Sequence, residues 1–125
     1  MVDKNLQKII CTAFSNGKKH DFRLFKDSKT QIHPAISVLT DSGYQGLQKL
    51  HAKTQMPKKR SKKNPVTLED KRNNQKLSSD RVLNENVIGS LKRFKIISDR
   101  YRNRRKRFSL RFNLIAGIHN LELAK

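Results

Sequence analysis

The chain has 125 residues, which allows one domain at most, or part of one. Its apolar content of 34% is low for a self-sufficient core, and 29 Lys and Arg against 10 Asp and Glu give a formal net charge of +19. This charge favours a polyanionic partner, nucleic acid above all, whereas no run approaches the roughly 18 consecutive apolar residues of a membrane-spanning helix. The N-terminus has no signal-peptide pattern, and the lone Cys11 excludes an internal disulfide. We expect a cytoplasmic, nucleoid-associated protein without a membrane partner.

Strands and short helices alternate in the pattern of the first half. Residues 9–14 are apolar and β-branched, which predicts a strand buried on both faces. Residues 20–29 predict a short amphipathic helix in which Asp21 caps the N-terminus or complements the helix dipole. Residues 36–40 predict a second buried strand, and residues 46–51 predict one or two helical turns. This order of elements indicates an α/β fold.

The middle of the chain is basic. We delimit a basic flexible loop at residues 56–76, of which residues 57–65 carry five positive charges and no apolar side chain. Its resemblance to a nuclear import signal is a weaker interpretation than phosphate contact or simple solvation. Within this segment, residues 67–74 already show a polar helical pattern.

Two helices are predicted in the last third. Ser78, Ser79 or Asp80 can cap the first, which has an apolar face formed by Val87, Leu91 and Phe94. The second has an apolar side with four members: Leu110, Leu114, Ile118 and Leu121. An arginine-rich run, residues 100–107, joins the two helices.

Two acidic residues stand out in this basic chain. Asp41 follows the predicted strand at residues 36–40, and ligands of α/β sheets bind outside the carboxyl ends of strands. Glu85 lies in the helical pattern after Asp80. Carboxylates suit Mg²⁺ or Mn²⁺, although from the residues alone a turn-forming Asp41 and a helical ion pair of Glu85 with Arg81 are stronger interpretations than a metal site.

Four sequence blocks together resemble DDE transposases of bacterial insertion sequences. Residues 40–47 (TDSGYQGL) are similar to the block around the second acidic residue of that family. Residues 81–94 (RVLNENVIGSLKRF) are similar to the block around its final Glu. Residues 13–22 and 102–120 resemble the flanking parts of the same domain, so the resemblance covers nearly the whole chain in order.

The resemblance implies a ribonuclease H-like fold and a metal-dependent site that cleaves and transfers DNA strands. It identifies residues 1–125 as the C-terminal part of the catalytic domain, with Asp41 as the second acid and Glu85 as the third. Both would hold Mg²⁺ or Mn²⁺. The family's first strand, which carries the first catalytic Asp, and its N-terminal DNA-binding part have no counterpart here, so the resemblance implies a partial fold. We therefore expect little or no strand cleavage by this chain alone.

The expected partner is DNA, together with an upstream transposase fragment or a second subunit. Candidate DNA-binding residues are basic side chains of the loop, of the block around Glu85 and of the arginine-rich run: Lys58, Lys59, Arg60, Arg81, Lys92, Arg102, Arg104 and Arg105. Two alternatives remain open, a non-catalytic basic nucleic-acid-binding protein and an inert remnant.

Overall fold

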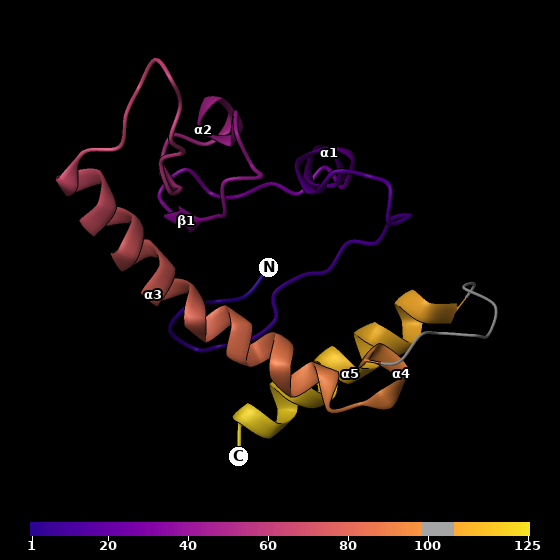
Figure 1. Ribbon diagram of the computed structural model, residues 1–125. Coiled ribbons are helices and arrows are strands. Elements are labelled where there is room, and N and C mark those ends of the chain that lie inside the picture. The colour runs from indigo at the N-terminus through magenta and orange to yellow at the C-terminus, as the bar shows by residue number, and fades with distance from the viewer. Residues whose placement is uncertain (99–106) are drawn as a thin grey trace. The chain divides into compact units, whose positions relative to one another are not determined.

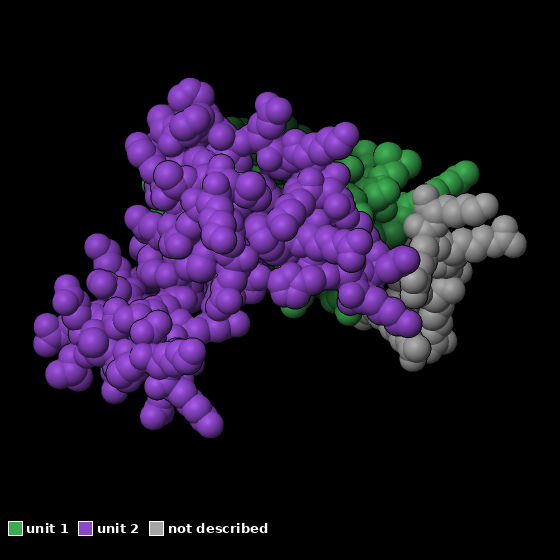
Figure 2. All heavy atoms as spheres, turned by 90° about the horizontal axis from the view of Figure 1, so that it is seen from above, with its two compact units in different colours: residues 1–14, 82–125 green, residues 15–81 purple. Residues whose placement is uncertain are grey.

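The computed structural model describes residues 1–98 and 107–125, which divide into two compact units (Figure 2). Unit 1 comprises residues 1–14 and 82–125, and unit 2 comprises residues 15–81. The described residues form helices and a small two-stranded sheet (Figure 1). The long helix α3 (Leu68–Lys92) contributes its first part to unit 2 and its last part to unit 1.

Unit 2 begins with helix α1 (Asp21–Asp27), where the sequence predicts a helix. The N-cap is His20 rather than Asp21, because the His20 side chain accepts a hydrogen bond from the N–H of Phe22. Asp21 lies in the first turn and Lys26 in the last, so each complements the helix dipole. The His20–Asp21 pair therefore serves the start of a helix.

The sheet of unit 2 joins strands β1 (Val38–Leu39) and β2 (Thr54–Gln55) in parallel, with Val38 opposite Thr54 and Leu39 opposite Gln55. A parallel pair needs a crossover connection, and helix α2 (Leu47–Leu50) lies within it. The expected buried strand at residues 36–40 is thus shorter than predicted. Its two strand residues are half-buried, and Ile36 is exposed.

Buried polar groups hold this small sheet in place. The ring of His51 bonds through Nε2 to the carbonyl oxygen of Ile36 at 2.6 Å, and the hydroxyl of Thr54 donates to the carbonyl oxygen of His51 at 2.7 Å. Leu47 of α2, a near neighbour of His51 in the sequence, is also fully buried. Because these polar groups are paired, their burial costs little.

Helix α3 is continuous from Leu68 to Lys92, so the prediction of a new helix capped by Ser78, Ser79 or Asp80 is wrong. Thr67 and Asp70 start the helix by a capping box, in which each side chain accepts the other residue's backbone N–H. Serine costs only a few tenths of a kcal/mol inside a helix, which does not stop one that is already started. Residues 68–76 of the segment delimited as a basic loop are therefore helical.

The N-terminal segment of unit 1 is not the predicted strand at residues 9–14. Val2 and Ile9 form an isolated antiparallel bridge, and Ile10 is 62% exposed rather than buried. Phe14 instead contacts the aromatic rings of Phe108 and Phe112, at centroid distances of 6.2 and 5.4 Å. A few backbone bonds to residues 1–3 and side-chain contacts, rather than an extended strand ladder, thus hold this segment.

Helices α4 (Lys95–Ser98) and α5 (Phe108–Leu123) complete unit 1. The buried residues of α5 are Ile115, Ala116 and His119, whereas its predicted apolar side is exposed at all four members: Leu110, Leu114, Ile118 and Leu121. Val87 and Leu91 of α3 are buried, as their apolar pattern predicts. An ion pair between Arg93 and Glu122 links the residue after α3 to the last turn of α5.

Candidate functional site

Asp41 lies at the carboxyl end of β1, where the sequence predicts it. Thr40, the residue before it, donates its N–H to the carbonyl oxygen of Gln55 at 3.0 Å. The Oδ1 atom of Asp41 accepts the N–H of Gly43 at 2.8 Å, and the N–H of Tyr44 donates to the Asp41 carbonyl oxygen at 3.3 Å. This Asx turn fixes the half-buried carboxylate just beyond the strand. Among the described residues, Oδ2 has no hydrogen-bond donor, which leaves it available to a cation.

The turn that follows Asp41 packs closely on itself and on α1. A Cβ atom at Gly43 would lie 3.0 Å from Oδ1 of Asp41, so a side chain there would press on the carboxylate. The rings of Tyr44 and Phe22 meet edge to face at a centroid distance of 6.4 Å. Gly46 adopts a φ of 96°, a conformation that glycine adopts without strain.

Two negative charges also act on Tyr44. Burial raises the pKa of its phenol, and the nearby charges of Asp21 and Asp41 raise this pKa further. The phenol is therefore a neutral hydrogen-bonding group at neutral pH. It cannot supply a second anion beside Asp41.

Glu85 lies on α3 with an exposed side chain, two residues before the buried Val87. No described residue forms an ion pair with Glu85, so the helical ion pair that the sequence also allows is not observed. Glu85 belongs to unit 1, whereas Asp41 belongs to unit 2. Within residues 1–98 and 107–125, no three His, Cys, Asp or Glu side chains form a cluster that could hold a metal ion.

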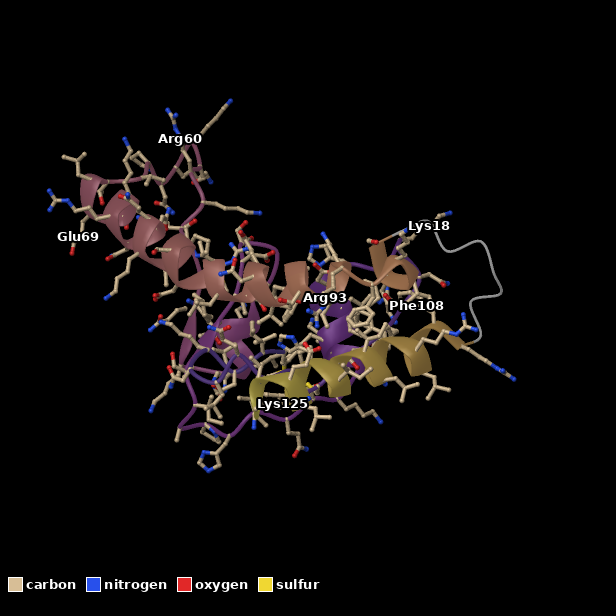
Figure 3. All side chains as sticks on the ribbon, turned by 90° about the horizontal axis from the view of Figure 1, so that it is seen from below. Lys18, Arg60, Glu69, Arg93, Phe108 and Lys125 are labelled. Atoms are coloured by element: carbon tan, nitrogen blue, oxygen red, sulfur yellow. The ribbon has the colours of Figure 1, made fainter. Side chains whose placement is uncertain are left out.

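The predicted basic residues differ in their surroundings. Lys58 is already paired, because its ammonium lies 2.6 Å from a carboxylate oxygen of Asp70. Lys59, Arg60 and Lys92 are exposed, and Figure 3 shows Arg60 on the loop near the start of α3. Arg81 is half-buried on α3. Three further candidates lie outside the described residues: Arg102, Arg104 and Arg105.

The sequence pattern of the DDE superfamily endonucleases matches residues 1–120. The chain belongs to this family. It is also 43% identical, over 124 residues, to the "Probable transposase for insertion sequence element IS702" of Microchaete diplosiphon. No solved structure matches the chain.

This DDE endonuclease family member covers 99% of its own length in that alignment but only 45% of the relative. The chain thus spans less than half the length of the transposase that it matches. In the described part of the chain, we find no helix with the length and apolar character needed to cross a bilayer.

Several residues of this family member matter to the basic loop but were not singled out from the sequence. Lys62 and Lys63 are exposed between Ser61 and Asn64, which hydrogen-bond to each other. Asn74 and Asp70 of α3 hold Lys58. The role of Asp70 at the start of α3 can be predicted from the sequence, because the Thr67–Asp70 spacing is that of a capping box. Nothing in the sequence pairs Asn74 with Lys58.

Proposed function

We propose that this chain is part of a DDE transposase and acts on DNA by metal-dependent phosphodiester chemistry. The observation that carries this proposal is the family match over residues 1–120, together with a carboxylate at the end of β1 in the block that resembles the family's second acid. The charge of +19 suits a DNA substrate. By family analogy the complete domain would have a ribonuclease H-like fold.

In this proposal Asp41 and Glu85 are metal ligands. Divalent ions held by these residues would supply the activation of a water or a 3′-hydroxyl and the stabilisation of the leaving oxygen. The Asx turn gives Asp41 a fixed orientation with Oδ2 directed to no described donor, which fits a hard cation such as Mg²⁺ or Mn²⁺. Glu85 fits the same role because its carboxylate is exposed and unpaired among the described residues.

Two carboxylates are fewer than a two-metal site normally uses. The family's first Asp has no counterpart among these 125 residues, so we propose that a part of the transposase outside them supplies it. That part would be an upstream transposase fragment or another transposase subunit. Alone, the chain would bind metal weakly and cut little.

Plasmid nicking tests this proposal. The purified chain is incubated with supercoiled plasmid and Mg²⁺ or Mn²⁺, either alone or mixed with the part of the Microchaete diplosiphon relative that lies outside the matched region. We expect nicking only in the mixture. Asp41→Asn and Glu85→Gln should abolish this nicking, whereas Glu69→Gln, which changes an exposed acid on the same helix as Glu85, should leave it intact.

Two outcomes would contradict the proposal. Nicking that persists in Asp41→Asn and Glu85→Gln would remove both residues from the active site. Nicking by the chain alone that is lost in Asp41→Asn would show that no second polypeptide is needed.

The exposed basic loop favours a second candidate function, that of a non-catalytic DNA-binding protein. Under this alternative the chain binds DNA without divalent metal, and the mixture does not nick plasmid. The Asp41→Asn variant would then bind DNA at least as tightly as the unchanged protein, because it carries one negative charge fewer.

A further inference from the structure

The basic loop between β2 and α3 is fixed at its base. The side-chain amide of Asn74 accepts the N–H of Lys58 at 2.8 Å and donates to the Lys58 carbonyl oxygen at 3.0 Å. The Lys58 ammonium also donates to Asp70 at 2.6 Å. Asp70 in turn accepts the N–H of Thr67 at 3.0 Å. Both ends of the loop, at residues 58 and 67, are thereby held to the start of α3.

The tip of the loop is closed as well. Ser61 donates its N–H to the carbonyl oxygen of Asn64 at 3.2 Å, and the Ser61 hydroxyl oxygen accepts the N–H of Asn64 at 3.0 Å. Lys62 and Lys63 lie between these two residues with exposed side chains. In the described chain, neither lysine forms an ion pair.

We infer that this loop is a preformed phosphate-binding element, in which Lys62 and Lys63 contact the DNA backbone and Lys58 positions the loop. The inference rests on the proposed action on DNA and adds the surface that binds it. Lys58 has its charge matched by Asp70, so it gains less from a phosphate than the unpaired tip lysines. Because the loop is held before binding, little conformational freedom remains to be lost when phosphates dock.

The composition of the loop favours nucleic acid over a membrane surface. Membrane-surface segments combine basic residues with Trp, Phe or Leu that enter the acyl boundary. Residues 57–65 contain no aromatic and no branched aliphatic side chain. Charge is thus their means of recognition, which suits the phosphodiester backbone.

The tip is tested by DNA binding at several salt concentrations. Lys62→Ala with Lys63→Ala is compared with Lys49→Ala with Lys76→Ala, which removes the same charge from exposed lysines elsewhere in unit 2. The readout is anisotropy of a labelled DNA duplex. If both tip lysines neutralise phosphates, the slope of log K against log salt should fall by about 2 in the tip variant and stay unchanged in the control.

The base of the loop is tested without changing charge. Asn74→Ala removes the two hydrogen bonds to Lys58, whereas Asn73→Ala changes an exposed neighbour that has no such bonds. Alanine favours a helix more than asparagine does, so neither variant weakens α3 through helix propensity. We expect Asn74→Ala to bind DNA about 2- to 10-fold more weakly with an unchanged salt slope, because only the ordering of the loop is lost.

Asp70→Asn gives a further test, because two explanations predict opposite changes in DNA affinity. If net charge alone matters, removal of a carboxylate strengthens DNA binding. If Lys58 positions the loop through Asp70, binding weakens despite the added positive charge. Far-UV circular dichroism of each variant checks that α3 is retained.

The outcomes separate this inference from the proposed function. If the unchanged chain does not bind the duplex, both fail. If it binds but the tip variant matches its lysine control, or Asn74→Ala matches Asn73→Ala, only the loop inference fails. Tip-dependent binding to phosphatidylserine vesicles with unchanged DNA binding would overturn the choice of partner, as would tip-dependent binding to RNA alone.

Discussion

Asn120 holds Ile9 by both of its backbone polar groups. The side-chain oxygen of Asn120 accepts the N–H of Ile9 at 2.7 Å, and its amide nitrogen donates to the Ile9 carbonyl oxygen at 2.8 Å. A neighbouring strand would offer a residue the same pair of bonds. One side chain on α5 thus takes the place of a second strand partner for Ile9, which also forms a bridge with Val2.

Asn120→Ala should therefore destabilise unit 1. The change leaves two partly buried backbone groups of Ile9 without their partners, which costs about 1–3 kcal/mol of unfolding free energy. Urea unfolding measures this loss. Asn113→Ala, which removes a more exposed contact to Thr12 on the same helix, should cost less. Equal losses in the two variants would show that the Ile9 contact has no special weight.

Replacement of Thr40 and of Thr54 by valine should change the unfolding free energy in opposite directions. The hydroxyl of Thr40 is buried without a hydrogen-bond partner among the described residues, whereas the hydroxyl of Thr54 donates to His51 at 2.7 Å. Thr40→Val should raise the unfolding free energy by about 1–2 kcal/mol, because it removes an uncompensated buried hydroxyl. Thr54→Val should lower it by about 1–3 kcal/mol. Thermal unfolding of both variants measures these changes. A lower unfolding free energy in Thr40→Val would mean that the Thr40 hydroxyl has a hydrogen-bond partner in solution.

The elements that sequence reasoning predicts well are those that local chemistry specifies. Helix α1 and helix α2 form within the residue ranges predicted for them, and Asp41 lies at a strand end as expected. The prediction of a strand at residues 9–14 is wrong for a physical reason. A strand ladder needs several residues paired with a second strand, whereas Ile9 forms an isolated bridge with Val2, and its own N–H and carbonyl oxygen bond to a side chain 111 positions later in the chain. Hydrophobic pattern carries no information about such a distant contact.

The candidate site has the same limit. From composition alone, the lysines of the loop are equivalent. In the structure, Asn74 and Asp70 anchor Lys58, whereas Lys62 is exposed. Asn74 contacts Lys58 in the same two-bond manner as Asn120 contacts Ile9, and both pairings join residues far apart in sequence. The apolar pattern was also insufficient to predict which residues of α5 are buried, because the predicted apolar side that includes Leu114 is exposed.

Gly43→Ala tests the orientation of the Asp41 carboxylate. The added methyl group would lie 3.0 Å from Oδ1, so the carboxylate must shift by a few tenths of an ångström. We expect weaker Mn²⁺ binding by calorimetry, with little change in unfolding free energy. Gly17→Ala is the matched control, because a Cβ atom there meets no other atom within 4 Å. If the two variants bind Mn²⁺ equally well, the Asx turn does not orient a metal ligand.

Leu91 and Leu114 test which leucines form the core of unit 1. Leu91 is 5% exposed and Leu114 is 61% exposed. Leu91→Ala should lower the unfolding free energy by about 2–5 kcal/mol, because it leaves a cavity. Leu114→Ala should change it by no more than about 0.5 kcal/mol. A large loss in Leu114→Ala would show that this exposed side of α5 is covered in solution.

The Lys58–Asp70 pair should make stability depend on pH in the acid range. The hydrogen bond from the Lys58 ammonium, followed by that from the Thr67 N–H, lowers the pKa of Asp70 from 3.8 to about 2. Because the folded pKa is the lower one, this contribution is complete above pH 3.8 and disappears as the pH falls through about 2. NMR titration of the Asp70 carboxyl carbon measures the shift directly.

Lys58→Ala should raise the pKa of Asp70 toward 3.8, although the Thr67 N–H still keeps it somewhat lower. Lys19→Ala is the matched control. It removes the cation that most lowers the pKa of Asp27 and should leave the pKa of Asp70 unchanged. If Asp70 titrates at the same pH in the unchanged protein and in Lys58→Ala, the ion pair does not persist in solution, and the Lys58 end of the loop is then held by Asn74 alone.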